Sequence, residues 1–239
     1  PIQNEGTGEI RFAVVDTTNI EIPTKSSLYF DEEDIKEFRI NLKRGDTPLF
    51  TNKRYGDIAG TTLTCAASED YVLTAENCTE AEAESADKGW GQVRMYGEEN
   101  FAVATGESKT VTVNCGMANS SVEVDFSNFI ESMFPTYSIE LHTTDTPDRS
   151  FTFDQSNYQY RKAYFNVSET GRQLSYTVNL PSPYKGPYSG TLALSPSKCY
   201  TLSIKVKGDT TSTTVTLGVT VDGTLLEEIL LTENINPYQ

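Results

Sequence analysis

The chain is poor in the residues from which metal sites and catalytic sites are usually built. Its 239 residues include one histidine, His142, and four cysteines, none of which forms a Cys-x-x-Cys pair. Structural zinc sites take their ligands from Cys and His side chains at short, regular spacings. A Ser-His-Asp triad would need a serine nucleophile near His142, and the chain has no nucleophile-elbow pattern. We therefore expect no catalytic residues, no metal site and no cofactor, and a partly exposed His142 at the end of a strand.

Positive charge and long apolar runs are also scarce. The chain has 19 Lys and Arg residues and 34 Asp and Glu residues, which gives a net charge of −15. Such a chain is repelled by polyanions, so nucleic acid is not expected as a partner, and neither is electrostatic docking to anionic lipid. No apolar run approaches the roughly 20 residues that a membrane-spanning helix needs. Residues 1–8 show no signal-peptide pattern and are interpreted as a flexible lead-in.

Two acidic stretches, Asp31–Asp34 and Glu80–Glu84, remain as candidates for a cation site. Calcium is bound by carboxylate and carbonyl oxygens in loops with a defined spacing around a glycine. Neither stretch has that spacing. Solvated surface charge is therefore the preferred interpretation, and calcium binding is the alternative.

What the chain does contain is alternation of apolar and polar residues with a period of two. Segments such as Glu9–Val15, Glu37–Leu42 and Tyr71–Ala75 show it. Much of the large side-chain volume comes from 13 Tyr and 11 Phe residues. This pattern predicts half-buried β-strands separated by turns. Short helical turns are expected at Asp31–Ile35 and at Phe129–Phe134, which Pro135 ends. We predict an all-β fold of two consecutive β-sandwich domains, with one or two short helical turns.

A boundary between the two domains is expected where a new cycle of strands begins. The run from Cys115 to Asn119 is rich in small residues, and strand alternation resumes directly after it. This predicts a lead-in over residues 1–8, an N-terminal sandwich over 9–118 and a C-terminal sandwich over 119–239. Residues 79–89 are a polar excursion from the first sandwich, with helix-forming Ala and Glu.

The cysteines leave two interpretations open. Tyr71–Cys78 and Thr110–Cys115 are strand patterns that each end in a cysteine, so one disulfide between Cys78 and Cys115 is a candidate. Such a bridge requires an oxidising compartment. The alternative is that these two residues, with Cys65 and Cys199, are small apolar residues of the core.

Aromatic residues on loops supply candidate contact sites. Trp90, Tyr96 and Phe101 lie in or beside one Gly-containing loop, where rings can stack on sugars, and the alternative is that Trp90 packs over an edge of the first core. Tyr184 and Tyr188 lie in a Pro-rich loop, and Tyr is a contact residue that loses little conformational entropy on binding. These five residues are the candidate ligand or partner contacts.

Several segments together resemble a known family. The chain is similar to Bacteroidetes lipoproteins of a domain-of-unknown-function family that is grouped with the fimbrillin-like, cell-adhesion superfamily. The likeness extends from about residue 8 to about residue 232, and it departs at Ala67–Asp70, where the family usually has a tighter turn. The segments that carry it are Tyr55–Gly60, Tyr71–Cys78, Trp90–Phe101, Val111–Asn119, Phe126–Leu141 and Lys162–Phe165.

The resemblance implies fimbrillin- or transthyretin-like sandwiches in a non-enzymatic cell-surface lipoprotein, held in the outer membrane by a lipid anchor upstream of Pro1. It also implies a secretory signal peptide outside this chain. An adhesin or a fimbria-associated subunit is the function it favours, with other surface or fimbrial proteins or host or dietary glycans as partners. A glycan-binding module of a polysaccharide-uptake system is the alternative.

Two further expectations follow from the resemblance. In fimbrillin-type assembly one subunit adds a strand to an open sheet edge of the next, so Ile10–Val15 or the strands within Thr213–Leu231 are the exchangeable elements. Thr17 and Thr210 each follow an aspartate in the short Asp-Thr-Thr form of the O-glycosylation sites of that bacterial group.

Overall fold

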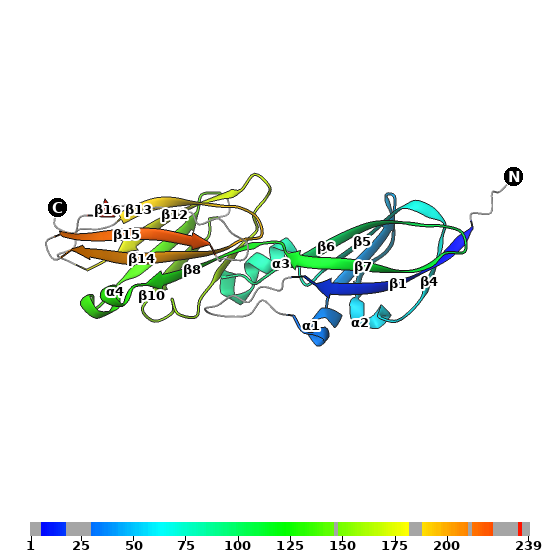
Figure 1. Cartoon of the computed structure of the whole chain (residues 1–239), viewed down its shortest axis with the longest axis horizontal. Helices are drawn as coiled ribbons and strands as arrows, with labels where there is room; N and C mark the ends of the chain where they lie inside the picture. The colour runs from blue at the N-terminus through cyan, green and yellow to red at the C-terminus, as the bar shows by residue number, and fades with distance from the viewer. Residues whose placement is uncertain are drawn as a thin grey trace. The chain divides into compact units, whose positions relative to one another are not determined.

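The protein folds into two compact units. The computed structural model describes residues 6–17, 30–145, 148–181, 188–209, 212–221 and 234–235 (Figure 1). Of these, residues 6–17, 30–80 and 94–118 form the first unit, whereas residues 81–93 and those from Asn119 onward form the second. The boundaries predicted from the sequence stay a prediction, but residues 81–93 lie in the second unit although both of their flanks lie in the first.

The first unit is built on one seven-stranded sheet, and it begins with a strand that lies inside that sheet. Its strands follow the order β3-β2-β5-β6-β7-β1-β4. β1 pairs in parallel with β7 and antiparallel with β4. The strands are β1 (Thr7–Asp16), β2 (Arg39–Arg44), β3 (Thr47–Arg54), β4 (Leu63–Ala66), β5 (Ser68–Glu76), β6 (Met95–Val103) and β7 (Ser108–Met117).

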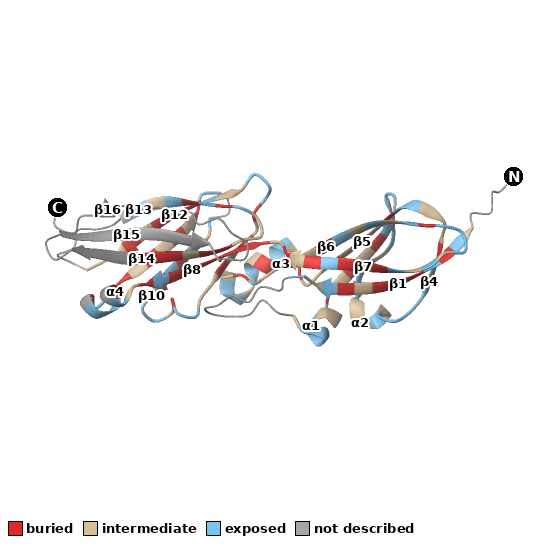
Figure 2. Cartoon of the chain, viewed as in Figure 1, coloured by how far each residue is buried: buried red, intermediate tan, exposed pale blue. Residues whose placement is uncertain are grey.

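This sheet folds over on itself into a sandwich. Alternation places Ile10, Phe12 and Val14 of β1 in the core, while the residues between them face outward (Figure 2). The rings of Phe12 in β1 and Phe50 in β3 are 5.9 Å apart, edge to face, although these strands lie at opposite sides of the strand order. Contact between strands so far apart in the order requires two facing layers.

The second unit is a sandwich of two separate sheets. A four-stranded sheet has the order β10-β9-β12-β13, and a five-stranded sheet has the order β11-β8-β14-β15-β16. The core between them is a single cluster that includes Val124, Phe153 and Leu202. The strands are β8 (Ser120–Phe126), β9 (Ser138–Thr143), β10 (Ser150–Asp154), β11 (Ala163–Phe165), β12 (Arg172–Asn179), β13 (Tyr188–Leu194), β14 (Cys199–Asp209), β15 (Ser212–Val221) and β16 (Asn234–Ile235).

The all-β prediction of consecutive sandwiches is confirmed, and the helical content is higher than expected. Helices were expected near α1 and α4, and both are present, but the described residues hold further helical segments. None of them is long and apolar enough to cross a membrane. The helices are α1 (Glu32–Lys36), α2 (Tyr55–Ile58), α3 (Glu80–Ser85) and α4 (Asn128–Met133), with a 3-10 turn at Asp87–Gly89.

Candidate functional site

Trp90 lies in the second unit and packs on that unit's core. Its ring is 5.3 Å from the ring of Phe151 and 5.0 Å from that of Phe153, both edge to face. The guanidinium of Arg161 lies 5.1 Å from the indole and is also paired with Asp87. The alternative interpretation, that Trp90 packs over an edge of the first core, is therefore wrong. Its indole is half-buried, which makes it a structural contact of the second sandwich.

The carboxylate of Glu84 anchors the same segment. It lies 3.1 Å from the Arg149 guanidinium and pairs closely with Arg172, and it accepts a hydrogen bond from the backbone N–H of Asn166 at 2.9 Å. The Arg149 and Arg172 side chains are each only 12% exposed. Burial lowers the pKa of Arg149, and the nearby Glu84 carboxylate opposes that shift. Charged groups this buried are stable only when they are paired and hydrogen-bonded, as here.

Backbone hydrogen bonds complete the attachment of residues 81–93, called here the inserted segment. Arg149 donates to the carbonyl oxygens of Tyr164 at 2.8 Å and Gly89 at 2.7 Å, and Tyr164 N–H donates to the Trp90 carbonyl at 2.8 Å. Gly91 has φ +87°, and a Cβ there would lie 2.9 Å from the Tyr164 Cβ. Only glycine fits so close an approach at a positive φ. The inserted segment is thus an integral part of the second sandwich.

The remaining aromatic candidates are not gathered with Trp90. Tyr96 and Phe101 lie in β6 of the first unit, where Tyr96 donates to Glu98 at 2.9 Å and Phe101 stacks on Tyr71 at 5.3 Å. Tyr184 lies outside the described residues, and Tyr188 is the first residue of β13, with a side chain that is not described. The five contact candidates therefore do not form one site within either unit, and their role in binding stays a prediction.

The cysteines are buried thiols, and no disulfide joins them in the structure. Cys65, Cys78, Cys115 and Cys199 are at most 8% exposed. The Cys115 thiol points toward the carbonyl oxygen of Ala75 at 3.6 Å, and the Cys78 thiol toward the side-chain oxygen of Asn77 at 3.4 Å. The structure therefore has no Cys78–Cys115 bridge, and a bridge in the native protein stays a prediction. Burial raises the pKa of the Cys115 thiol to about 12.

Of the two candidate glycosylation sites, Thr17 is among the described residues and Thr210 is not. Thr17 directly follows β1 and is exposed, and its hydroxyl donates to the Cys115 carbonyl oxygen at 3.0 Å. Thr210 lies outside the described residues. Modification of either threonine stays a prediction.

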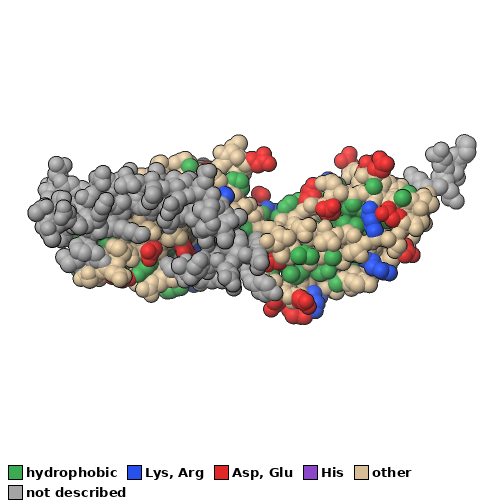
Figure 3. Space-filling view, viewed as in Figure 1, with side chains coloured by type: hydrophobic (Ala, Val, Ile, Leu, Met, Phe, Trp, Pro, Cys, Tyr) green, Lys and Arg blue, Asp and Glu red, His purple; other side chains and the backbone are tan. Residues whose placement is uncertain are grey.

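The acidic stretches have structural roles. Asp31 caps α1 by accepting from the N–H groups of Glu33 and Asp34, and Asp34 accepts in return from the N–H of Asp31. This reciprocal arrangement is a capping box, and carboxylates in a first turn also favour the helix dipole. In the residues that the structure describes, no group of three or more His, Cys, Asp or Glu side chains could hold a metal ion. Acidic and basic side chains are interspersed on the face of the first unit shown in Figure 3.

His142 lies on the outward face of β9 and is partly exposed, as predicted. Its ring nitrogens are 3.7 Å from Glu140 and 4.0 Å from Asp148. Ser150 of β10 and Ser175 of β12 lie directly across from it in register. Neither serine hydroxyl is hydrogen-bonded to His142, so the His contacts carboxylates and not a nucleophile.

The edges of the sheets differ in how well they are protected against pairing with another chain. β3 carries Pro48 near its start, Lys53 and Arg54 at its end, and an irregular register with β2. β4 and β11 are short. By contrast, β13 has seven residues without a charge or a proline, in unbroken register with β12 and with no other strand among the described residues. Charges, prolines and bulges are the usual protection of an edge, and β13 has none of them.

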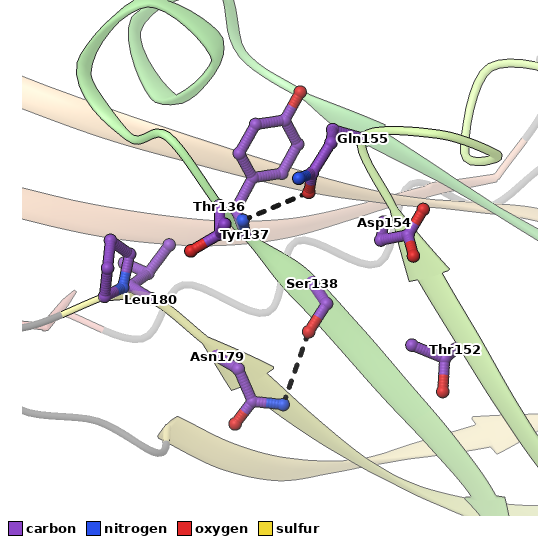
Figure 4. Close-up of a pocket in the computed structure, with 9 residues that line it drawn as sticks. Thr136, Tyr137, Ser138, Thr152, Asp154, Gln155, Asn179 and Leu180 are labelled. Atoms are coloured by element: carbon purple, nitrogen blue, oxygen red, sulfur yellow. Dashed lines mark hydrogen bonds between the residues drawn. The ribbon is translucent and has the colours of Figure 1, made fainter.

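A hollow of about 320 Å³ lies at one end of the four-stranded sheet, where β9 begins and β10 and β12 end (Figure 4). Asp154, Ser138 and Asn179 stand side by side in register across these strands. Backbone register alone brings them together, so the separate strand patterns gave no signal for this site. The hollow is lined by Thr136, Tyr137, Ser138, Thr152, Asp154, Gln155, Asn179, Leu180 and Pro181.

Comparison with known proteins gives a family and a set of distant structural likenesses. The fimbrial assembly protein of Parabacteroides distasonis is 9% identical with a TM-score of 0.44, over 91% of this chain and 98% of that one. The fimbrial anchor protein Mfa2 of Porphyromonas gingivalis is 11% identical with a TM-score of 0.44, over 97% and 99%. Candidate polysaccharide-binding proteins of Bacteroides thetaiotaomicron are 9% identical with a TM-score of 0.46, over 95% and 99%.

No curated protein matches the sequence. The family model of the domain of unknown function DUF4493 matches residues 6–237, which is nearly the whole chain. The chain therefore belongs to the DUF4493 family.

Proposed function

We propose that the protein is a non-enzymatic cell-surface lipoprotein that acts as an adhesin or a fimbria-associated subunit. Its partners are other surface or fimbrial proteins, or glycans, and a lipid anchor upstream of Pro1 holds it in the outer membrane. The observation that supports this function best is the edge strand β13, which has no charge, no proline and no further strand beside it among the described residues. An open, uncharged edge strand presents unpaired N–H and C=O groups, which bind an extended segment of another chain by strand addition.

The side chains of β13 suit such an addition. Leu192 and Leu194 face the core and fix the strand on the sheet, whereas Ser189, Thr191 and Ala193 face outward and are small. An incoming strand would therefore meet backbone groups and short side chains, with no charge to repel it. Main-chain hydrogen bonds would supply the affinity, and the outward positions would contribute little specificity.

β1 and the terminal strands are the segments to be donated. β1 carries three apolar residues, Ile10, Phe12 and Val14, at alternate positions, which is the pattern that a donated strand needs. Of the terminal segment Thr213–Leu231, residues up to Val221 belong to β15, and the rest lies outside the described residues.

A charge on β13 tests the proposal. Ala193→Lys adds a cation to the outward face of the edge without touching the core, and we expect it to abolish multimers that the parental protein forms, with or without tryptic trimming near Arg11. Thr51→Lys on the already protected edge β3 is the matched control and should leave the multimers unchanged. Size-exclusion chromatography with light scattering measures both. Monomers of the parental protein at every concentration, trimmed or not, would remove the strand-addition basis of the proposal.

A glycan-binding module of a polysaccharide-uptake system is the second candidate function. The hollow at the end of the four-stranded sheet favours it, because its lining combines polar groups with a small apolar wall. Trp90 does not favour it, since that ring is already packed against Phe151 and Phe153.

A further inference from the structure

The hollow at the ends of β9, β10 and β12 has polar groups that make few or only long hydrogen bonds to the described residues. In Figure 4 the side chains of Asp154 and Thr152 stand on one side and that of Asn179 on the other, with Ser138 between them. Asn179 donates to Ser138 and to Glu140 only at 3.5 and 3.4 Å, and its amide oxygen accepts no hydrogen bond from the described residues. One Asp154 oxygen accepts twice from Ser156, while its other oxygen accepts no hydrogen bond from the described residues.

The two sides of the hollow present complementary kinds of group. The Thr152 hydroxyl, the second Asp154 oxygen and the Asn179 amide supply both donors and acceptors on one face of the sheet, where Thr152 lies two positions before Asp154 in β10. Leu180 lies next to Asn179 in Figure 4, and Leu180 and Pro181 are the aliphatic residues of the lining. A ligand that fits must therefore carry several hydroxyl groups in one direction and aliphatic C–H groups in another. A sugar ring has this combination.

Charge narrows the class of sugar. Asp154 is the one charged residue among the described residues of the lining, and the nearby Glu140 has the same sign. Among the described residues no Lys or Arg lines the hollow, and the whole chain carries a net charge of −15. A carboxylate or sulfate on the ligand would be desolvated against Asp154, and the described lining offers no cation to pair it. The hollow thus discriminates against acidic sugars.

The position of the hollow on rigid structure makes it a pre-formed site. Asp154, Ser138 and Asn179 are each the terminal residue of a paired strand. The Gln155 side chain is held by the backbone N–H of Tyr137, whose ring is buried against Phe126. Groups fixed in this way lose little conformational entropy when a ligand binds. A volume of about 320 Å³ is at the small end of ligand pockets, which suits one ring of a longer chain.

We propose that this hollow binds a neutral hexose or N-acetylhexosamine unit of a surface or dietary glycan. Asn179 and Asp154 hold the ring hydroxyls, Thr152 adds a further hydrogen bond, and Leu180 with Pro181 covers the C–H face. The inference deepens the proposed surface role and rests on it for the choice of a glycan as ligand. It places recognition on the outer face of the second sandwich and not at Trp90.

Saturation-transfer NMR on the full chain tests the site. The probes are the methyl glycosides of glucose, galactose and mannose, N-acetylglucosamine, and N-acetylneuraminic acid as the acidic comparison, each at millimolar concentration. At least one neutral probe should show transfer, and the acidic probe should show none. Asn179→Ala should weaken the binding of that probe by about tenfold, the effect of roughly one good hydrogen bond. Gln173→Ala, an exposed residue of the same strand outside the hollow, should bind like the parental protein.

Three results would overturn the inference: no transfer to any neutral probe, preferential transfer to N-acetylneuraminic acid, or unchanged binding by Asn179→Ala. If the far-UV circular dichroism spectrum of Asn179→Ala shows that the variant is unfolded, Thr152→Val takes its place in the test. Thr152 is exposed, and valine is nearly isosteric with threonine. The multimer assay with Ala193→Lys is independent of this one. Multimers without sugar binding would remove the sugar site and leave strand addition, whereas sugar binding by a strict monomer would do the reverse.

Discussion

The guanidinium of Arg149 lies 3.1 Å from the carboxylate of Glu84, a residue 65 positions earlier in the chain. Glu84 belongs to the inserted segment, which leaves the first unit after Glu80 and returns to it at Arg94. The chain thus passes between the units at 80–81, at 93–94 and at 118–119. The second sandwich is therefore not encoded by one continuous stretch, and its folding depends on residues that precede its first strand, β8.

Replacing Arg149 by Ala should destabilise the second unit. The change removes the ion pair with Glu84 and leaves the carbonyl oxygens of Tyr164 and Gly89 without their donor. Breaking a buried pair from one side costs about 3–5 kcal/mol, and we expect the lower end because Arg172 still holds Glu84. Urea unfolding followed by the emission of Trp90, the sole tryptophan, measures the change.

Arg54→Ala is the matched control for Arg149→Ala. Arg54 also pairs with a glutamate, Glu37, but both side chains are largely exposed, and pairs in solvent contribute little. Its unfolding curve, read by circular dichroism, should stay close to that of the parental protein. Equal effects of the two substitutions would contradict the role assigned to Arg149.

Trp90→Ala should lower stability whether or not a ligand is present. The substitution leaves a gap against Phe151 and Phe153 and removes one of the contacts of the Arg161 guanidinium, at an expected cost of about 3 kcal/mol for a half-buried ring. Circular dichroism during urea unfolding is the readout, because the variant has no tryptophan. Tyr160→Ala, which removes a ring that is 66% exposed beside the same Arg161, should change stability little. A stable Trp90→Ala protein that loses ligand binding would restore Trp90 as a contact residue.

Local patterns in the sequence predicted the elements of this fold but not the destination of the inserted segment. Alternation identified β1 and β2, and α3 lies in residues 79–89, where the sequence has helix-forming Ala and Glu but no helix was predicted. Nothing local marked Glu84 as different from Glu80 or Glu82, because its partners Arg149 and Arg172 lie 65 and 88 positions away. The hollow could not be predicted from the sequence either, because only strand register brings Asp154, Ser138 and Asn179 together. Side-chain pairing across strands is a property of the assembled sheet.

Thiol titration should find four reactive groups after unfolding without reductant. The structure has Cys65, Cys78, Cys115 and Cys199 as buried thiols. In the native protein at pH 8 the Cys115 thiol should react slowest, because it is fully buried and its pKa is raised to about 12, which leaves a very small fraction of reactive thiolate. Ellman's reagent gives the number of thiols in urea and the rates of thiol reaction in the native protein. Two thiols instead of four, with Cys78 and Cys115 protected from alkylation, would establish the bridge in the native protein.

Alkaline pH should destabilise the second unit through Tyr164. Burial raises the pKa of this phenol from 10 to about 12, and the nearby Cys199 and Glu123 add to the shift. Above pH 10 the unfolded chain therefore releases a proton that the folded chain keeps, so stability falls as the pH rises, and the loss is complete near pH 12. A shift of this size corresponds to at most about 3 kcal/mol. Tyr164→Phe cannot ionise, so its stability should fall less between pH 10 and 12, measured by urea unfolding at each pH. Tyr160→Phe, at an exposed position on the same connection, should keep the parental slope, and identical slopes for all three proteins would show that Tyr164 is not the group responsible.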